Sequence, residues 1–166
     1  KKILKFLEDR NIFPSIPQRN KVLLFPIIIE TKDNSIYLFN DNIFYEKWNE
    51  KKNSYDLLDY LLPSEDIEDL IELQKISKDI ETYDFSNLIN KYGITDSIIL
   101  IINKEGSNIR TLSKINLNNN LKLENKNYSK VDILNDNDFS YIVKSLKKIY
   151  EDQWKKNNEI NTSIKL

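Results

Sequence analysis

Carboxylates are the main groups in this chain that could move a proton, because the sequence contains neither histidine nor cysteine. One acidic cluster consists of Glu65, Asp66, Glu68 and Asp69, at the expected start of a helix. The helix dipole favours negative charge at this position. We therefore interpret these side chains as a solvated helix start and not as an acid–base pair. No catalytic residue is predicted.

A second acidic cluster, Asp132, Asp136 and Asp138, has a spacing that suggests a calcium loop. Such a loop needs a glycine at its sixth position and a glutamate at its twelfth, and this segment has neither. The three acids are better suited to cap the helix that follows. No metal site is predicted, since thiolate and imidazole ligands are also missing from the chain.

Cofactor and nucleic-acid binding are disfavoured by composition. Gly93 and Gly106 are the only glycines, whereas loops that cradle phosphates need several close together. The 25 basic residues are balanced by 26 acidic ones, giving a net charge of −1 without the basic excess typical of nucleic-acid-binding proteins. We expect no cofactor and no nucleic-acid partner. No apolar run is long enough to predict a membrane span.

Three aromatic residues, Phe44, Tyr45 and Trp48, lie close together on an expected short helix. Aromatic side chains at such spacing usually belong to a core. Their alternative role is a surface anchor for a ligand or a partner. We keep these three residues as the candidate binding surface.

The most apolar run of the chain, residues 21–30 (KVLLFPIIIE), predicts a strand that is covered on both faces. Pro26 has no N–H to donate, so it predicts either a bulge or an open edge, where a partner chain could add a strand. A second buried strand is expected at residues 98–102. It is reached through helices and is therefore predicted to run parallel to the first.

Shorter patterns predict the remaining strands. Residues 35–39 should form a hairpin with residues 21–30, and residues 55–62 should form a strand that ends before a proline. Residues 94–127 predict a three-stranded meander, with turns at residues 104–107 and 118–120.

The helices have signals at their ends. Ser64 is expected to cap the first helix after the third strand, and Asp84 the next one, which Gly93 should end in a left-handed conformation. The inner face of the first is expected to carry Ile67, Leu70 and Ile71. The longest helix has an apolar face that consists of Phe139, Ile142, Val143, Leu146, Ile149, Tyr150 and Trp154. Its opposite, solvated face is expected to carry Lys144, Lys147, Lys148 and Lys155.

These elements predict an α/β (α+β) domain with a single mixed β-sheet of about five or six strands and helices packed on its faces. At 166 residues the chain is expected to be one domain. Residues 1–20 are interpreted as the end of a helix and an extended connector. Residues 157–166 are interpreted as a frayed tail.

Four segments, VLLFPIIIE, IYLFNDN with IFYEKW, LLPSEDIED and INKYGITDSIILI, together resemble a bacterial envelope family, domain of unknown function 2066. Trp48 stands at its second tryptophan and Phe44 where its first would be, while Ile43 replaces a proline. Pro63 and Asp66 to Asp69 fit its middle step; Tyr92, Gly93 and Asp96 approximate a later step with one residue extra. The resemblance covers residues 21–134. A more distant similarity is to the amino-terminal α/β domain of the Tol translocation component.

The resemblance implies a periplasmic or cell-envelope protein without catalytic residues that acts through protein–protein contact. We therefore expect a non-enzymatic domain with an envelope protein as its partner. The alternative is a domain that binds or hydrolyses a small molecule or carbohydrate with carboxylates. That alternative needs two acids converging in an apolar pocket. The oligomeric state stays open.

Overall fold

A computed structural model describes residues 20–30, 35–37, 47–48, 50, 56–64 and 66–165. Its strands are β1 (Asn20–Glu30), β2 (Ser35–Tyr37), β3 (Leu58–Leu61), β4 (Ser97–Glu105), β5 (Asn108–Leu117) and β6 (Asn120–Tyr128). Its helices are α3 (Ile67–Lys78), α4 (Ser86–Tyr92) and α5 (Asp136–Lys165). The strands form one six-stranded mixed sheet, as predicted.

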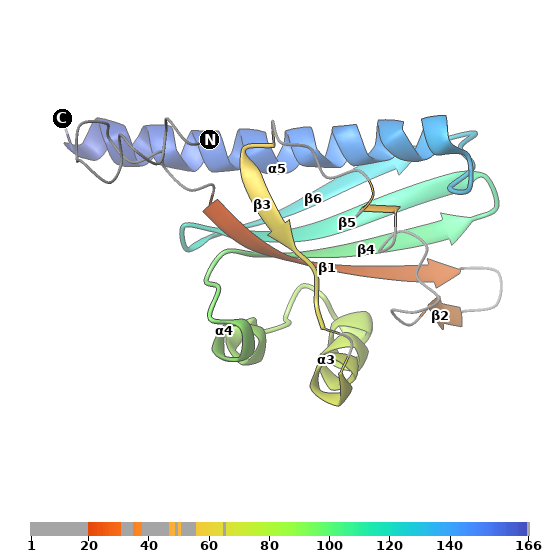
Figure 1. Ribbon diagram of the computed structural model, residues 1–166, viewed down its shortest axis with the longest axis horizontal. Coiled ribbons are helices and arrows are strands. Elements are labelled where there is room, and N and C mark those ends of the chain that lie inside the picture. The colour runs from red at the N-terminus through yellow and green to blue at the C-terminus, as the bar shows by residue number, and fades with distance from the viewer. Residues whose placement is uncertain are drawn as a thin grey trace, which may run out of the picture.

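Helices cover both faces of this sheet. Figure 1 shows α5 along one face and α3 with α4 on the other. The strand order is β2-β1-β4-β5-β6, and β3 also pairs with β1. No helix of the described segments is long and apolar enough to cross a membrane.

Strand β1 lies at the centre of the core. Its side chains alternate, so that Val22, Leu24 and Ile28 pack on the α5 side and Leu23, Phe25 and Ile27 pack on the α3–α4 side. Burial on both faces explains why the run has no polar residue between Val22 and Ile29. The parallel pairing of β1 with β4 and its antiparallel hairpin with β2 are both confirmed.

Pro26 lies where the edge partner of β1 changes. The register with β3 ends at Leu23, and the register with β2 begins at Ile28. On the other side, β1 and β4 pair residue by residue through Pro26 without an offset, so there is no bulge toward β4. A proline fits this place because it has no N–H to offer to either edge strand.

The meander was predicted from alternation and turn residues, and it is confirmed. Gly106 and the pair Asn118 and Asn119 adopt positive φ angles of 58°, 53° and 63° in its two turns. Turns of this kind match the twist of the strands that they connect. Gly93, with φ of 66°, ends α4 as predicted.

Helix α3 is rotated relative to the prediction. Its N-cap is Asp66, not Ser64, and its buried residues are Asp69, Glu72, Leu73 and Ile76. Ile67 and Ile71 were expected inside, but they are 75% and 48% exposed. The helix can turn two carboxylates inward because α4 and the preceding loop supply hydrogen-bond donors to them.

Helix α5 has the predicted apolar face and is longer than predicted. Phe139, Ile142 and Tyr150 are fully buried, and Trp154 packs at the margin of the same core. The Asn135 side chain accepts hydrogen bonds from the backbone N–H groups of Asn137 and Asp138, at 3.0 and 3.1 Å, and starts the helix. The backbone stays helical to Lys165, where a frayed tail was expected.

Candidate functional site

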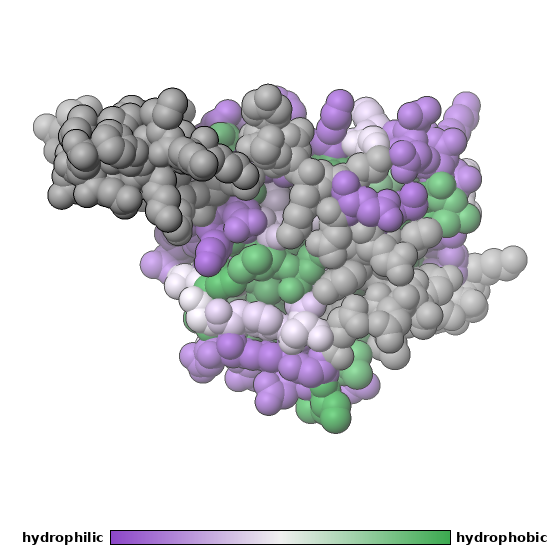
Figure 2. Space-filling model, in the orientation of Figure 1, coloured by the Kyte–Doolittle hydropathy of each residue, from purple (hydrophilic) through white to green (hydrophobic). Residues whose placement is uncertain are grey.

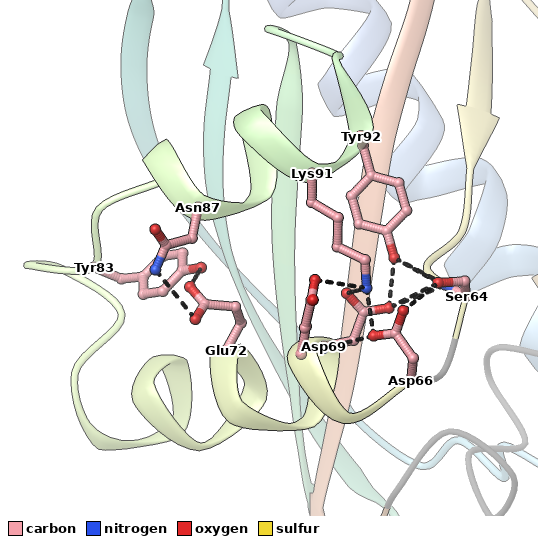
Figure 3. A network of polar contacts seen from close by, with 9 residues as sticks. Ser64, Asp66, Asp69, Glu72, Tyr83, Asn87, Lys91 and Tyr92 are labelled. Atoms are coloured by element: carbon pink, nitrogen blue, oxygen red, sulfur yellow. Dashed lines mark hydrogen bonds and ion pairs between the residues drawn. The ribbon is translucent and has the colours of Figure 1, made fainter.

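Two groups of polar side chains lie side by side between α3 and α4 (Figure 3). The first group joins the start of α3 to the end of α4 and consists of Ser64, Asp66, Asp69, Lys91 and Tyr92. Local structure positions it: Asp66 caps α3, so Asp69 falls in the first turn. Gly93 ends α4 directly after the lysine and the tyrosine.

Asp69 is the centre of the first group and is completely buried. One carboxylate oxygen accepts a hydrogen bond from Lys91 Nζ at 2.8 Å. The other accepts from the Tyr92 hydroxyl at 2.5 Å and from the backbone N–H of Ser64 at 3.1 Å. Burying a carboxylate costs free energy because it loses its hydration. Here the hydrogen bonds from these donors compensate for that loss. The prediction that Asp69 lies on a solvated face is therefore wrong.

Lys91 connects this buried carboxylate to the surface. It also donates to Asp66, and Glu68 lies 4.0 Å from its Nζ. Partial burial acts to lower the pKa of Lys91, but the hydrogen bonds to Asp66 and Asp69 outweigh it and raise the pKa. The hydrogen bond from Lys91 also lowers the pKa of Asp66. Both groups therefore stay charged at neutral pH and form an ion pair rather than a proton relay.

The second group surrounds Glu72. Its carboxylate accepts hydrogen bonds from the Tyr83 hydroxyl at 2.6 Å, from Lys75 at 3.0 Å and from Asn87 at 3.4 Å. Burial acts to raise the pKa of Glu72, but these hydrogen bonds outweigh it and lower the pKa. Burial and the Glu72 carboxylate raise the pKa of the Tyr83 phenol. At neutral pH this group therefore consists of an ionised carboxylate and a neutral phenol.

The lowered pKa of Glu72 predicts an acid-sensitive contribution to stability. The unfolded state takes up a proton near the ordinary glutamate value of about 4.3, whereas the folded state does so only at lower pH. The stabilisation is therefore complete above that value and is lost as pH falls through the folded pKa. Glu72→Gln should flatten the decline in unfolding free energy at acid pH, measured by urea titrations across a pH series.

The exposed residue Glu68, on the same helix, provides the control for this experiment. Glu68→Gln should leave the acid decline as steep as in the unchanged chain. An equally steep decline in Glu72→Gln would contradict the prediction.

A groove of about 480 Å³ lies over these two groups, between α3 and α4. We call it the α3–α4 groove. Its lining residues are Glu68, Ile71, Glu72, Lys75, Asn87, Leu88, Asn90 and Lys91. The apolar side chains are those of Ile71 and Leu88, and charged or amide side chains surround them. The space-filling view shows apolar atoms at the foot of the molecule, over α3, whose exposed apolar residues are Ile67 and Ile71 (Figure 2).

Of the predicted binding residues, Trp48 is fully buried, and Phe44 and Tyr45 lie outside the described residues. The Trp48 ring packs edge-on against Tyr60, with centroids 5.4 Å apart. Its indole is part of the core on the α5 side of the sheet. The predicted binding surface therefore no longer includes Trp48, and for Phe44 and Tyr45 it stays a prediction.

The position predicted for Lys147 is also wrong. It was placed on the solvated face of the long helix, whereas it is buried and lies 2.8 Å from Asp56 Oδ2. Its Nζ also lies 5.6 Å from the centre of the Trp48 ring. The other lysines of that predicted face, Lys144, Lys148 and Lys155, are exposed.

Two buried polar residues were missed at the sequence level. Lys114 donates hydrogen bonds to the backbone carbonyls of Glu81 and Tyr83, at 2.8 and 2.7 Å, and burial lowers its pKa. Asp96 accepts hydrogen bonds from the Asn20 amide at 2.5 Å and from the backbone N–H of Asn118 at 3.0 Å. Lys114 of β5 therefore binds the loop that precedes α4, and Asp96 binds the turn between β5 and β6.

The second acidic cluster, Asp132, Asp136 and Asp138, lies at the start of α5 and in the loop before it. Asp132 accepts from the backbone N–H of Leu134, and Asp138 accepts from that of Asp132, each at 2.9 Å. These contacts hold the loop before α5, whereas the helix N–H groups of Asn137 and Asp138 are capped by Asn135, so the predicted capping by Asp132 and Asp138 is not what these contacts do. Within the described segments, no three acidic side chains converge so that they could hold a metal ion.

The chain matches no protein-family model and no curated protein. Among solved structures, it is similar to the crystal structure of lipoprotein GNA1162 from Neisseria meningitidis. The TM-score is 0.45 and the sequence identity is 10%, over 76% of this chain and 92% of that chain.

Proposed function

We propose that this chain is a non-enzymatic domain of the bacterial cell envelope that binds another protein through the α3–α4 groove. The observation that carries the proposal is the exposure of Ile71 in the lining of this groove and of Ile67, one helical turn earlier on α3. Exposed isoleucine side chains in and beside a groove are suited to a partner that supplies apolar side chains in return.

The surroundings of the groove support a protein as the ligand. The exposed Ile71 and the buried Leu88 line the apolar part of the groove, and Glu68, Lys75 and Lys91 surround it with charges of both signs. An apolar centre within a polar rim is the usual anatomy of a protein–protein interface. Because the rim charges are of both signs, they can set the orientation of the partner more readily than they can attract one ion.

The alternative function is binding or hydrolysis of a small molecule or carbohydrate by carboxylates. A general acid needs a pKa raised toward neutral pH, whereas hydrogen bonds lower the pKa values of Glu72 and Asp66. The inner carboxylate, Asp69, is closed off by Lys91, Tyr92 and Ser64. These contacts favour the binding function over the hydrolytic one.

Placement in the periplasm or envelope rests on the resemblance of residues 21–134 to domain of unknown function 2066. The same resemblance supports a protein partner from the envelope.

Photo-crosslinking tests this function. A photoreactive residue at position 67 or 71 of the full chain, expressed in its native host, should give an adduct of defined mass with one envelope protein. Leu134 provides the matched control because it is also apolar and exposed, and it lies outside the groove. Ile71→Lys should weaken binding to the crosslinked protein by about tenfold or more, which corresponds to roughly 1.4 kcal/mol.

Two results would overturn the proposal. One is a yield of adducts at positions 67 and 71 no higher than at position 134. The other is turnover of a glycoside or ester substrate by the unchanged chain that Glu72→Gln abolishes, which would establish the hydrolytic alternative.

A further inference from the structure

Strand β6 forms an edge of the sheet. Within the part of the chain that the structure describes, its strand partner is β5, along nine paired residues. Most of its side chains are exposed, and only Tyr128 is buried. Long exposed edges are ready templates for another strand, and proteins commonly shorten or cover them.

The face of β6 on the α3–α4 side carries two exposed leucines. Leu121 and Leu123 are 63% and 42% exposed. They pair with Asn116 and Lys114 of β5, and Lys114 lies over Phe85 of the core on that side. The buried side chains of α3 and α4 pack with those of β1 and β4, so the helices leave the leucines of β6 uncovered.

The turn before β6 determines which backbone groups face outward. Asn118 and Asn119 form a two-residue turn, so Leu117 and Asn120 direct their backbone groups at each other. Backbone groups alternate along an antiparallel strand, and those of Leu121 and Leu123 therefore point to the open edge. The residues with outward backbone groups are the same ones that carry the exposed leucine side chains.

We propose that two copies of this chain associate by antiparallel pairing of their β6 strands about a two-fold axis at Leu123. This register places Leu123 opposite Leu123 of the second copy, and Leu121 opposite Asn125. It also places Lys122 opposite Glu124 of the second copy, and the reverse. The two lysine–glutamate pairs occupy non-hydrogen-bonded positions, where side chains of opposing strands come closest.

Charge distinguishes this register from its neighbours. If the axis lies at Lys122 or at Lys126, that lysine is opposite the same lysine of the second copy. If it lies at Glu124, the two Glu124 side chains are opposite each other, and Lys122 is opposite Lys126. Like charges directly opposite each other destabilise a sheet. An axis at Asn125 pairs Glu124 with Lys126 but places Leu123 against Asn127, so it loses the leucine contact.

The residues of β5 that lie opposite Lys122 and Glu124 are uncharged, so they do not compete with a second copy for an ion pair. Lys122 pairs with Ile115 and Glu124 with Ser113 across the β5–β6 ladder. Within one copy the two side chains lie 2.9 Å apart along the strand and are both partly exposed. They can therefore bind the opposite charges of a second copy without giving up a buried partner.

Sedimentation velocity of the full chain across a wide range of concentration tests the proposal. We expect a reversible shift from the 19.8 kDa monomer to twice that mass. Leu123→Lys should weaken association by about tenfold or more, since it places two ammonium groups at the axis. Lys122→Glu and Glu124→Lys should each weaken it, and the double variant Lys122→Glu with Glu124→Lys should restore it.

Lys126→Glu is the control for register, because Lys126 faces Asn120 in the proposed pairing and should matter little. Circular dichroism should show that every variant keeps its fold, as expected for changes at exposed positions. A monomer at all concentrations would overturn the proposal, and so would a dimer in which the double variant fails to recover. Ile71→Lys should leave the dimer intact, which separates this surface from the α3–α4 groove.

Discussion

Replacing Asp69 with alanine should lower the free energy of unfolding by about 2–4 kcal/mol, because hydrogen bonds to a charged group contribute roughly 1.5–3 kcal/mol each. The side chain is completely buried, and it accepts hydrogen bonds from Lys91, Tyr92 and the backbone of Ser64. Without it, the Tyr92 hydroxyl and the Ser64 N–H lose a charged acceptor, and only their weaker contacts with each other remain. Lys91 keeps Asp66, so it is not left without a partner.

Chemical denaturation at neutral pH measures this loss. Glu68→Ala is the matched control, because Glu68 is exposed on the same helix and lies 4.0 Å from the same lysine. An exposed ion pair of this kind contributes at most about 1 kcal/mol. A loss for Asp69→Ala no larger than that of the control would show that the network contributes little to stability.

Trp48→Ala should cost about 3–5 kcal/mol, the usual range for removing a large aromatic side chain from a core. Trp48 is fully buried, contacts Tyr60 edge-on and lies beneath the Lys147 ammonium group. The change leaves a cavity on the α5 side of the sheet and removes the ring over which a buried lysine sits. Many domains have a total stability of only about 5–15 kcal/mol, so this loss is a large share of it.

Urea unfolding followed by circular dichroism measures the effect of Trp48→Ala. Trp48→Phe should cost much less because it keeps most of the buried area, and Trp154→Ala should also cost less because that side chain is only partly buried. A variant Trp48→Ala with unchanged stability would mean that the indole is not part of the core. The aromatic surface predicted from the sequence would then regain Trp48.

Local patterns were sufficient for most of the fold. The run from Val22 to Ile29 contains no polar residue, so a strand formed by it must be buried on both faces. The two faces of β1 are indeed buried in the two halves of the core. Alternation along β5 and the turn residues Gly106, Asn118 and Asn119 were sufficient to predict the meander. These features could be read from the sequence because each depends on residues within a few positions of one another.

The site was harder to predict because its residues become neighbours only in the fold. Asp69, Glu72, Leu73 and Ile76 do have helical spacing, but a carboxylate on that face is acceptable only if donors meet it. Those donors are Lys91, 22 residues further along, and Tyr83, 11 residues further along. Lys147 likewise depends on Asp56, 91 residues earlier.

The sequence alone therefore determined where strands, turns and helices lie, and which chemistry its missing residue types disfavour. The tertiary structure decided which face of α3 is buried, which charges are inside and which strand is left at the edge. The physical reason is that burying a charge is a property of pairs of distant residues, whereas burying an apolar run is a property of the run itself. For β6 the same holds, because its leucines are exposed only as a result of where α3 and α4 pack.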